Sequence, residues 1–239
     1  MQSLSSMNKI AEDYNMKRSL KPLLLVLLCI MLAAGSTGCG RDFDASGYVK
    51  GVLDLNFQGQ TEKALEMIDG STAESLKAQY KEFIDTFVAN NITNEIDMGD
   101  LKTSQFAELV SKIFSVMRYS VGEADKTGKK EYEVPVEIRP SDVFIRFQQL
   151  LTEDSLKIAQ DVKDGVYKGT DEEVQQQILS DIINHAYELL DVASSEMEFQ
   201  DAKTVIVKVK ADKRNEYSID GDDMDNLVIK ILRLDEIQG

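Results

Sequence analysis

Apolar and polar residues alternate along this chain with two different periods. In several stretches the apolar residues recur every three or four positions while the opposite positions are polar, which is typical of amphipathic helices that bury one face. These stretches are Tyr48–Leu53, Leu76–Val88, Phe106–Met117, Val143–Leu151, Val174–Leu190 and Met224–Leu232. A shorter helix containing Leu65 and Ile68 is expected after Thr61. The pattern predicts several helices that pack on one core.

Elsewhere the period is two, which is typical of half-buried strands. The apolar members of the first such stretch are Tyr132, Val134, Val136 and Ile138. Thr127–Gly128 offers a turn before it, so we expect 119–125 to be its hairpin partner. Pro135 has no backbone donor, which predicts an edge strand or a bulge at this position. A second set of strands is predicted at 205–209 and 217–219.

The order of elements is helices, hairpin, helices, strands and a final helix. Strand groups separated by helix groups favour an α+β fold, with amphipathic helices packed on an antiparallel β-sheet. Two tandem helix-then-hairpin units, 46–140 and 141–239, are a further hypothesis, although residue-level identity between these halves is poor.

Polar residues mark where several helices begin. Ser71–Glu74 and Thr170–Glu173 have the spacing of capping boxes, in which two side chains satisfy backbone groups of the first turn. Pro140-Ser141-Asp142 is expected to open another helix, and Asp220 to cap the last one.

The first part of the chain has the composition of a secretory signal. Lys17-Arg18 precedes the apolar run Leu23–Ala34, and small residues follow up to Gly38. As a helix the run would span ~18 Å, short of the ~30 Å hydrocarbon core. We therefore predict that 1–38 is an over-extended N-terminus plus a signal peptide, with translation starting at Met16.

The signal ends in Ser36-Thr37-Gly38-Cys39, which resembles the lipobox of bacterial lipoproteins, with Ser36 where that family has Leu. The resemblance implies cleavage between Gly38 and Cys39 and a thioether-linked diacylglycerol on Cys39, with acyl chains such as palmitate. Residues 39–45 would then be the lipidated cysteine and a short tether, and 46–239 an extracytoplasmic domain. The predicted location is the extracytoplasmic face of the cell membrane.

Two further stretches resemble known families. Asp42–Lys50, just after this cysteine, resembles the opening of an uncharacterised group of Gram-positive lipoproteins with a domain of unknown function. Tyr217–Ile219 followed by a capped helix is similar to nuclear-transport-factor-like cone folds, in which helices pack into a curved sheet and leave a pocket. These resemblances imply no activity, and Cys39 is the only functional residue that they carry over.

Charge and cysteine content narrow the function classes. The chain has 27 Lys+Arg and 42 Asp+Glu, and without 1–38 the numbers are 23 and 40, a net charge of −17. This excess of acids argues against a nucleic-acid partner and against a domain that lies flat on an anionic leaflet. Cys29 would leave with the signal and Cys39 would carry the lipid, so the mature domain depends on its core rather than on disulfides.

Few residues suggest chemistry. His185 is the only histidine, and a base or metal ligand is one interpretation of it. The mature chain would have no second histidine for zinc, no Gly-x-Ser-x-Gly elbow and no cysteine left free, so we interpret His185 as a half-buried residue with its hydrogen bonds satisfied. No catalytic, cofactor-binding or metal residues and no cofactors are assigned.

Two charged clusters have two interpretations each. Asp220–Asp225 could bind Ca²⁺, but it lacks the spacing of an EF-hand, and capping of the following helix is favoured. Lys208, Lys210, Lys213 and Arg214 could bind an anionic polymer, but the solvent face of a strand, where lysine discourages edge pairing, is favoured.

We therefore expect a membrane-anchored extracytoplasmic lipoprotein that is a non-catalytic binding module. Its partner would be a small ligand or an envelope protein, bound in a groove between helices and sheet. The alternative is a carboxylate-dependent cell-envelope hydrolase, which would need two carboxyl groups ~5–9 Å apart in a cleft.

Overall fold

The computed structural model describes residues 43–68, 70–93 and 98–237, and these divide into two compact units. The sheet unit contains the described residues up to Pro140 together with Phe199–Leu232. The helical unit contains Ser141–Glu198 and the described residues from Arg233 onward.

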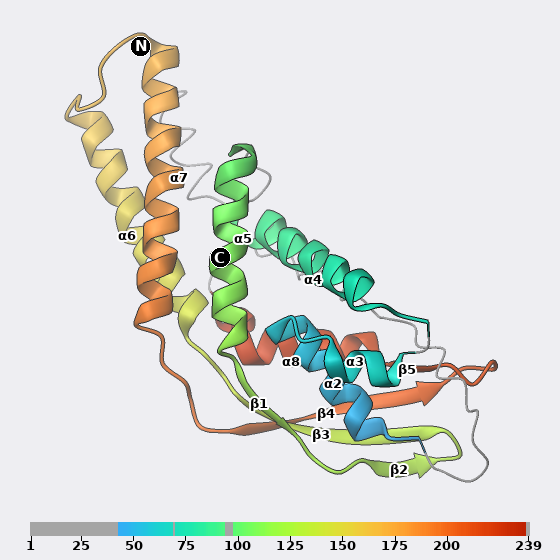
Figure 1. The fold of residues 1–239 in the computed structure, drawn as a ribbon. Coiled ribbons are helices and arrows are strands. Elements are labelled where there is room, and N and C mark those ends of the chain that lie inside the picture. Colours follow the sequence, from blue (N-terminus) through green and yellow to red (C-terminus); the bar gives the residue numbers. More distant parts are fainter. Residues whose placement is uncertain (1–42, 69, 94–97, 238–239) are drawn as a thin grey trace. The chain divides into compact units, whose positions relative to one another are not determined.

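The sheet unit combines helices with five strands (Figure 1). Its helices are α2 (Ala45–Gln58), α3 (Glu62–Met67), α4 (Ala73–Val88), the π-helical η1 (Ala89–Thr93), α5 (Gly99–Ser115) and α8 (Gly221–Leu232). Its strands are β1 (Arg118–Val121), β2 (Asp125–Gly128), β3 (Glu131–Arg139), β4 (Lys203–Ala211) and β5 (Tyr217–Ile219). The predicted α+β class is confirmed.

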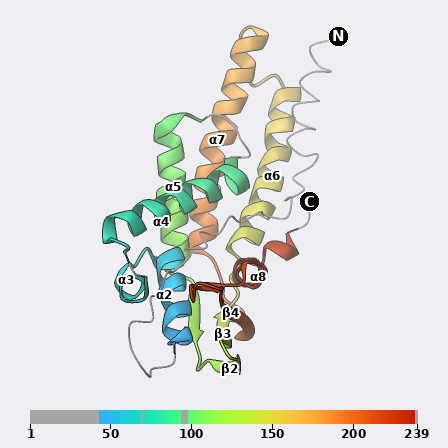
Figure 2. The ribbon, with the colours of Figure 1, turned by 90° about the vertical axis from the view of Figure 1, so that its right-hand side faces the viewer.

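The sheet is antiparallel in the order β1-β3-β4-β5, and β2 pairs with β3 beyond the end of β1. The predicted alternation of apolar positions in β3 is confirmed, because Val134, Val136 and Ile138 are fully buried. Val134 lies opposite Val207, which is also buried. Helices α2 and α8 contact this apolar face, α2 through β3 and α8 through β4 (Figure 2). The opposite face carries charged pairs such as Glu131 and Lys210 in register.

Pro135 does not lie in an edge strand, so that alternative of the prediction was wrong. Strand β3 is paired on both sides, with β4 along one side and with β1 and β2 along the other. The Pro135 carbonyl accepts a hydrogen bond from Gly122 N at 2.8 Å, at the interruption between β1 and β2. Because N and O of one strand residue point to the same side, the missing donor faces this interruption. The missing N–H of Pro135 therefore removes no backbone hydrogen bond between paired strands.

The two units do not coincide with the tandem halves 46–140 and 141–239. Strand β4 pairs with β3 from Glu131↔Lys210 to Ile138↔Lys203, so strands of both expected halves belong to one sheet. The C-terminal helix α8 contacts β4 in the same unit.

Helix starts follow the predicted capping chemistry with small shifts. Thr170 and Glu173 form a capping box at the start of α7 (Asp171–Ser195), as predicted. The box at α4 lies one residue later than predicted, because Thr72 and Ser75 exchange the hydrogen bonds. Thr61 is the N-cap residue of α3 but makes no side-chain cap bond.

The helical unit is an α-helical hairpin of α6 (Val143–Lys163) and α7 (Figure 1). The short η2 (Leu234–Glu236) contacts α6. Its buried residues concentrate near the open end of the hairpin, at Val143, Phe144, Phe147, Leu190 and Ala193. Asp142 precedes α6, and its carboxylate accepts bonds from Arg146 Nε and Glu198 N, both at 2.7 Å. Among the described residues, none of the helices combines the length and apolar character needed to cross a membrane.

Candidate functional site

The described chain begins in an aromatic cluster at one end of the sheet. The Phe43 ring stacks on Tyr217 with ring centroids 3.7 Å apart and an interplanar angle of 4°. Phe43 also meets Tyr48 edge-on at 5.6 Å and Tyr132 at 6.1 Å. These rings come from α2, β3 and β5, so the cluster fixes the first residues of the domain to the sheet.

The first turn of α2 is held in two further ways. Asp44 is its N-cap, and its Oδ1 accepts a bond from Gly47 N at 2.7 Å. Ser46 Oγ donates to the Gly122 carbonyl at 2.8 Å, in the loop between β1 and β2. The chain is therefore anchored to the sheet within a few residues of its first described position.

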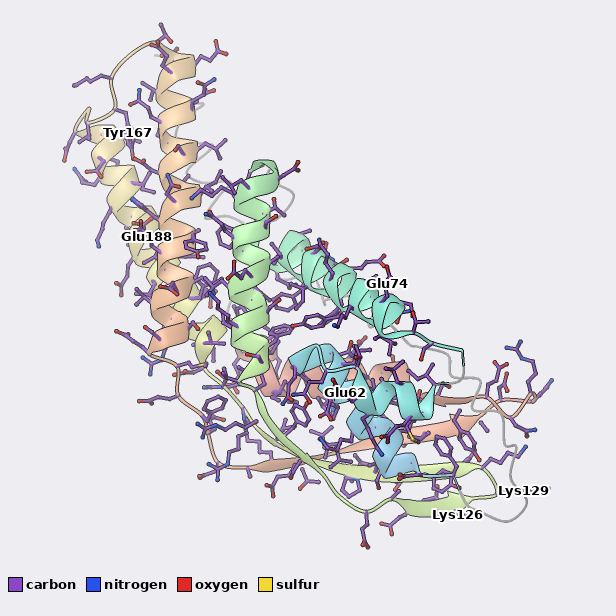
Figure 3. All side chains as sticks on the ribbon, in the orientation of Figure 1. Glu62, Glu74, Lys126, Lys129, Tyr167 and Glu188 are labelled. Atoms are coloured by element: carbon purple, nitrogen blue, oxygen red, sulfur yellow. The ribbon has the colours of Figure 1, made fainter. Side chains whose placement is uncertain are left out.

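Two turns lie beside this cluster, and together we call them the sheet tip (residues 125–131 and 210–217). Ala211 N donates to the Lys130 carbonyl at 3.1 Å, and Lys130 Nζ donates to Asn215 Oδ1, so the two turns are joined. Lys126 Nζ lies 5.9 Å from the ring centroid of Tyr132. Figure 3 shows Lys126 and Lys129 at this end of the sheet.

The turn between β4 and β5 is ordered by Asp212. Its Oδ1 accepts bonds from Glu216 N at 2.9 Å and Arg214 N at 2.7 Å. The backbone bond from Glu216 is the main reason that the pKa of Asp212 lies below its usual value. Asn215 has φ 68°, a left-handed conformation that asparagine tolerates better than most residues. The cationic side chains of this turn are therefore presented on a defined backbone.

The predicted basic cluster divides between the strand and this turn. Lys208 and Lys210 lie on the exposed face of β4, opposite Glu133 and Glu131 of β3. The Lys210 Nζ lies 4.0 Å from Glu131 Oε1. Lys213 and Arg214 lie in the turn and are exposed. The solvent-face interpretation therefore holds for the strand residues, while the other two belong to the sheet tip.

The acidic cluster caps α8 as predicted. Asp220 Oδ1 accepts bonds from Asp222 N at 3.1 Å and Asp223 N at 3.4 Å. Asp223 Oδ2 accepts a bond from Lys208 N at 3.0 Å, which ties α8 to β4. Burial raises the pKa of Asp225, and the charge of Asp222 raises it further. Within the described ranges, His, Cys, Asp and Glu side chains form no group of three or more that could hold a metal ion.

His185 has a carboxylate partner that the sequence did not reveal. Its Nδ1 lies 3.0 Å from both oxygens of Asp154, and the pair joins α7 to α6. Nearby, Tyr167 Oη donates to Asp181 Oδ2 at 3.1 Å. Burial and this hydrogen bond raise the pKa of Tyr167 to about 12. The first pair joins the two helices, and the second joins the loop between them to α7. His185 is half-buried, as predicted, and its Nδ1 is hydrogen-bonded.

A buried carboxylate in the sheet unit was also missed. Asp54 is 5% exposed, and its oxygens lie 2.8 and 2.9 Å from Lys50 Nζ. Tyr119 Oη donates to Asp54 Oδ1 at 2.9 Å. Burial and the adjacent carboxylate raise the pKa of Tyr119 well above its usual value. The i,i+4 spacing of Lys50 and Asp54 is visible in the sequence, but the contact with β1 is not.

Gly38 and Cys39, the predicted cleavage and lipidation residues, lie outside the described residues. The lipid anchor therefore stays a prediction. What the structure adds is the position of Phe43, four residues after Cys39 in the sequence, within the aromatic cluster.

Comparisons with known proteins give one structural similarity. No protein-family profile matches the chain, and no curated protein matches it. The crystal structure of a "putative lipoprotein (ycdA)" from Bacillus subtilis is similar, with a TM-score of 0.48 and 14% sequence identity. The match covers 79% of this chain and 56% of that chain, so this chain spans little more than half of the length of that protein.

Proposed function

We propose that this protein is an extracytoplasmic lipoprotein, held at the cell membrane by a diacylglyceryl thioether on Cys39, with a non-catalytic binding domain. The observation that carries the proposal is the short distance along the chain between the lipobox-like cysteine and the folded domain. Phe43 follows Cys39 by four residues and stacks on Tyr217. The sequence features of a signal thus end where the packed domain begins.

Two acyl chains on one cysteine suit a strongly acidic domain. A single acyl chain binds a bilayer only marginally, whereas two give stable anchoring. The formal net charge of −15 for the whole chain opposes adsorption of the domain to anionic lipids. The anchor would supply the membrane affinity that the acidic domain as a whole lacks.

The engagement of several weakly exposed carboxylates supports binding rather than carboxylate catalysis. Asp54 is bonded to Lys50 and Tyr119, and Asp154 contacts His185. Asp142 accepts bonds from Arg146 and a backbone amide. Groups held in this way join elements of the fold, whereas a glycoside hydrolase needs two carboxyl groups that face the substrate.

The anchor is tested by intact-mass analysis of the full chain, extracted in detergent from a Gram-positive host. We expect the wild-type chain and Cys29→Ala to start at Cys39 with a diacylglyceryl mass increment and to partition into detergent. Cys39→Ala should lack the increment. An unmodified Cys39 in wild-type protein would contradict the proposal.

The binding role is tested in membranes that contain the anchored protein. Lipidation confines the domain to a thin layer and raises its effective concentration near other membrane-bound molecules. Cross-linking should therefore yield a reproducible partner with wild-type protein and less of it when the Cys39→Ala chain is compared at equal abundance. Absence of any reproducible partner or ligand would count against a binding module.

A further inference from the structure

We infer that the sheet tip is a cationic contact surface for anionic phospholipid headgroups, which turns this end of the domain toward the bilayer. The inference rests on the proposed anchor at Cys39. It goes further by assigning a membrane-facing surface and a lipid class to a domain whose overall charge is strongly negative.

The first argument is where the chain joins the domain. Phe43 stacks on Tyr217, and Tyr217 begins β5 directly after the turn between β4 and β5. Tyr132, near the turn between β2 and β3, completes the cluster. A lipid at Cys39 would therefore be attached beside the sheet tip, and the tether could extend at most ~14 Å.

The second argument is charge. The sheet tip contains Lys126, Lys129, Lys130, Lys210, Lys213 and Arg214 against Asp125, Glu131, Asp212 and Glu216. The surplus there is positive, although the chain as a whole has a formal net charge of −15. The sheet tip is therefore a local exception to the charge that argues against contact with an anionic leaflet.

Several of the tip's acidic groups are also engaged within the protein. Asp212 accepts two backbone bonds, and Arg214 Nη2 lies 2.8 Å from Glu216 Oε2. Glu131 lies 4.0 Å from Lys210. Because each ion pair uses one cation with one acid, the surplus in this region stays positive, and Lys129 and Lys213 are cations exposed in the two turns.

The third argument is the length of the tether relative to the distance over which an anionic leaflet attracts cations. The potential of an anionic leaflet decays over a Debye length, ~8 Å at physiological ionic strength. A tether of this length keeps the sheet tip close enough for its lysines to enter that layer, while repulsion acts on the acidic remainder. Attraction at one end and repulsion elsewhere give the domain a preferred orientation on the membrane.

The test uses the full chain, lipidated in its host and reconstituted into vesicles. The chain contains no tryptophan, so Thr127→Trp reports on the sheet tip. Leu101→Trp, at a position 75% exposed near the start of α5, is the control. Vesicles consist of phosphatidylcholine with brominated acyl chains, alone or mixed with phosphatidylglycerol, and tryptophan quenching by bromine is measured.

We expect phosphatidylglycerol to increase quenching in Thr127→Trp but not in Leu101→Trp, and added salt to remove the increase. Adding Lys129→Gln and Lys213→Gln to Thr127→Trp should abolish the response. Lys102→Gln with Lys112→Gln, the same charge change on α5, should preserve it.

Mass analysis of each sample distinguishes failure of the proposed anchor from failure of the proposed contact surface. Protein without a lipid on Cys39 refutes the proposed anchor. If the protein is lipidated, the contact surface is refuted when phosphatidylglycerol does not change the quenching of Thr127→Trp. It is also refuted when phosphatidylglycerol increases the quenching of Leu101→Trp equally. The contact surface is also refuted if Lys102→Gln with Lys112→Gln abolishes the response to phosphatidylglycerol as fully as Lys129→Gln with Lys213→Gln does.

Discussion

Replacing Tyr119 by phenylalanine tests whether the buried polar cluster stabilises the sheet unit. The change removes only the hydroxyl that donates to Asp54 Oδ1 at 2.9 Å. The ring and its contact with Phe57, with centroids 5.6 Å apart, remain. The substitution therefore isolates one hydrogen bond between a β1 side chain and an α2 carboxylate.

The expected loss follows from the partners that remain. A hydrogen bond to a charged group contributes roughly 1.5–3 kcal/mol, and a buried acceptor left unpaired costs more. Lys50 Nζ still contacts both oxygens of Asp54 at 2.8 and 2.9 Å. We therefore expect Tyr119→Phe to lower the free energy of unfolding by about 1.5–2 kcal/mol, at the lower end of this range.

Equilibrium unfolding in urea, followed by circular dichroism, measures this loss. The midpoint should fall while the slope of the free energy against urea stays the same, because the surface exposed on unfolding does not change. Tyr132→Phe is a control, since it keeps the ring that contacts Phe43, Tyr217 and Lys126. A loss below about 0.5 kcal/mol in Tyr119→Phe, no larger than a typical surface change, would refute the reasoning.

The stabilisation that Tyr119 contributes also depends on pH. The raised pKa of Tyr119 means that, above pH ~10, the unfolded chain releases a proton that the folded chain keeps. Stability from this group is complete below that pH and is lost as pH rises further. Tyr80 and Tyr167 also have raised pKa values, so the measured quantity is the difference between wild type and Tyr119→Phe. That difference should shrink above pH ~10.

Three other predictions concern caps and core. Thr170→Ala should remove the capping box of α7 and destabilise its first turn by about 1 kcal/mol, seen as faster amide exchange there; unchanged exchange would contradict it. Leu190→Ala, at a fully buried site, should cost about 2–5 kcal/mol in urea unfolding, while Leu156→Ala, 62% exposed, should stay within about 0.5 kcal/mol. Similar losses in both would be the contrary result. Asp220→Ala should cost about 1 kcal/mol as a lost cap, and calcium should leave the melting temperature of wild type unchanged. A calcium-induced rise that Asp222→Ala and Asp223→Ala abolish would identify a metal site instead.

Local patterns in the sequence predicted the elements well, because burial of one face imposes a period on neighbouring residues. The alternation from Tyr132 to Ile138 correctly predicted β3 and its buried face. The Thr170 box was predictable because its partners are three residues apart. At α4 two adjacent hydroxyl residues, Ser71 and Thr72, compete for the cap, and spacing alone does not choose between them.

Contacts between distant residues could not be predicted in this way. Tyr119 and Asp54 are 65 residues apart, and His185 and Asp154 are 31 apart. Their meeting depends on which strand and helix face pack together, and no period in one chain encodes that choice. Pro135 illustrates the same limit, because its effect depends on where β1 ends on the neighbouring side of the sheet.

The pairing of β3 with β4 has a consequence for how the protein folds. These strands are neighbours, yet residues 140–202 lie between them. Asp142 N donates to the Glu198 carbonyl at 3.1 Å, so the hairpin of α6 and α7 brings its own ends together. If this hairpin forms first, the loop to be closed shrinks to a few residues, which lowers the entropic cost by about 2 kcal/mol. Substitutions at the open end of the helical hairpin should therefore slow the pairing of β3 with β4.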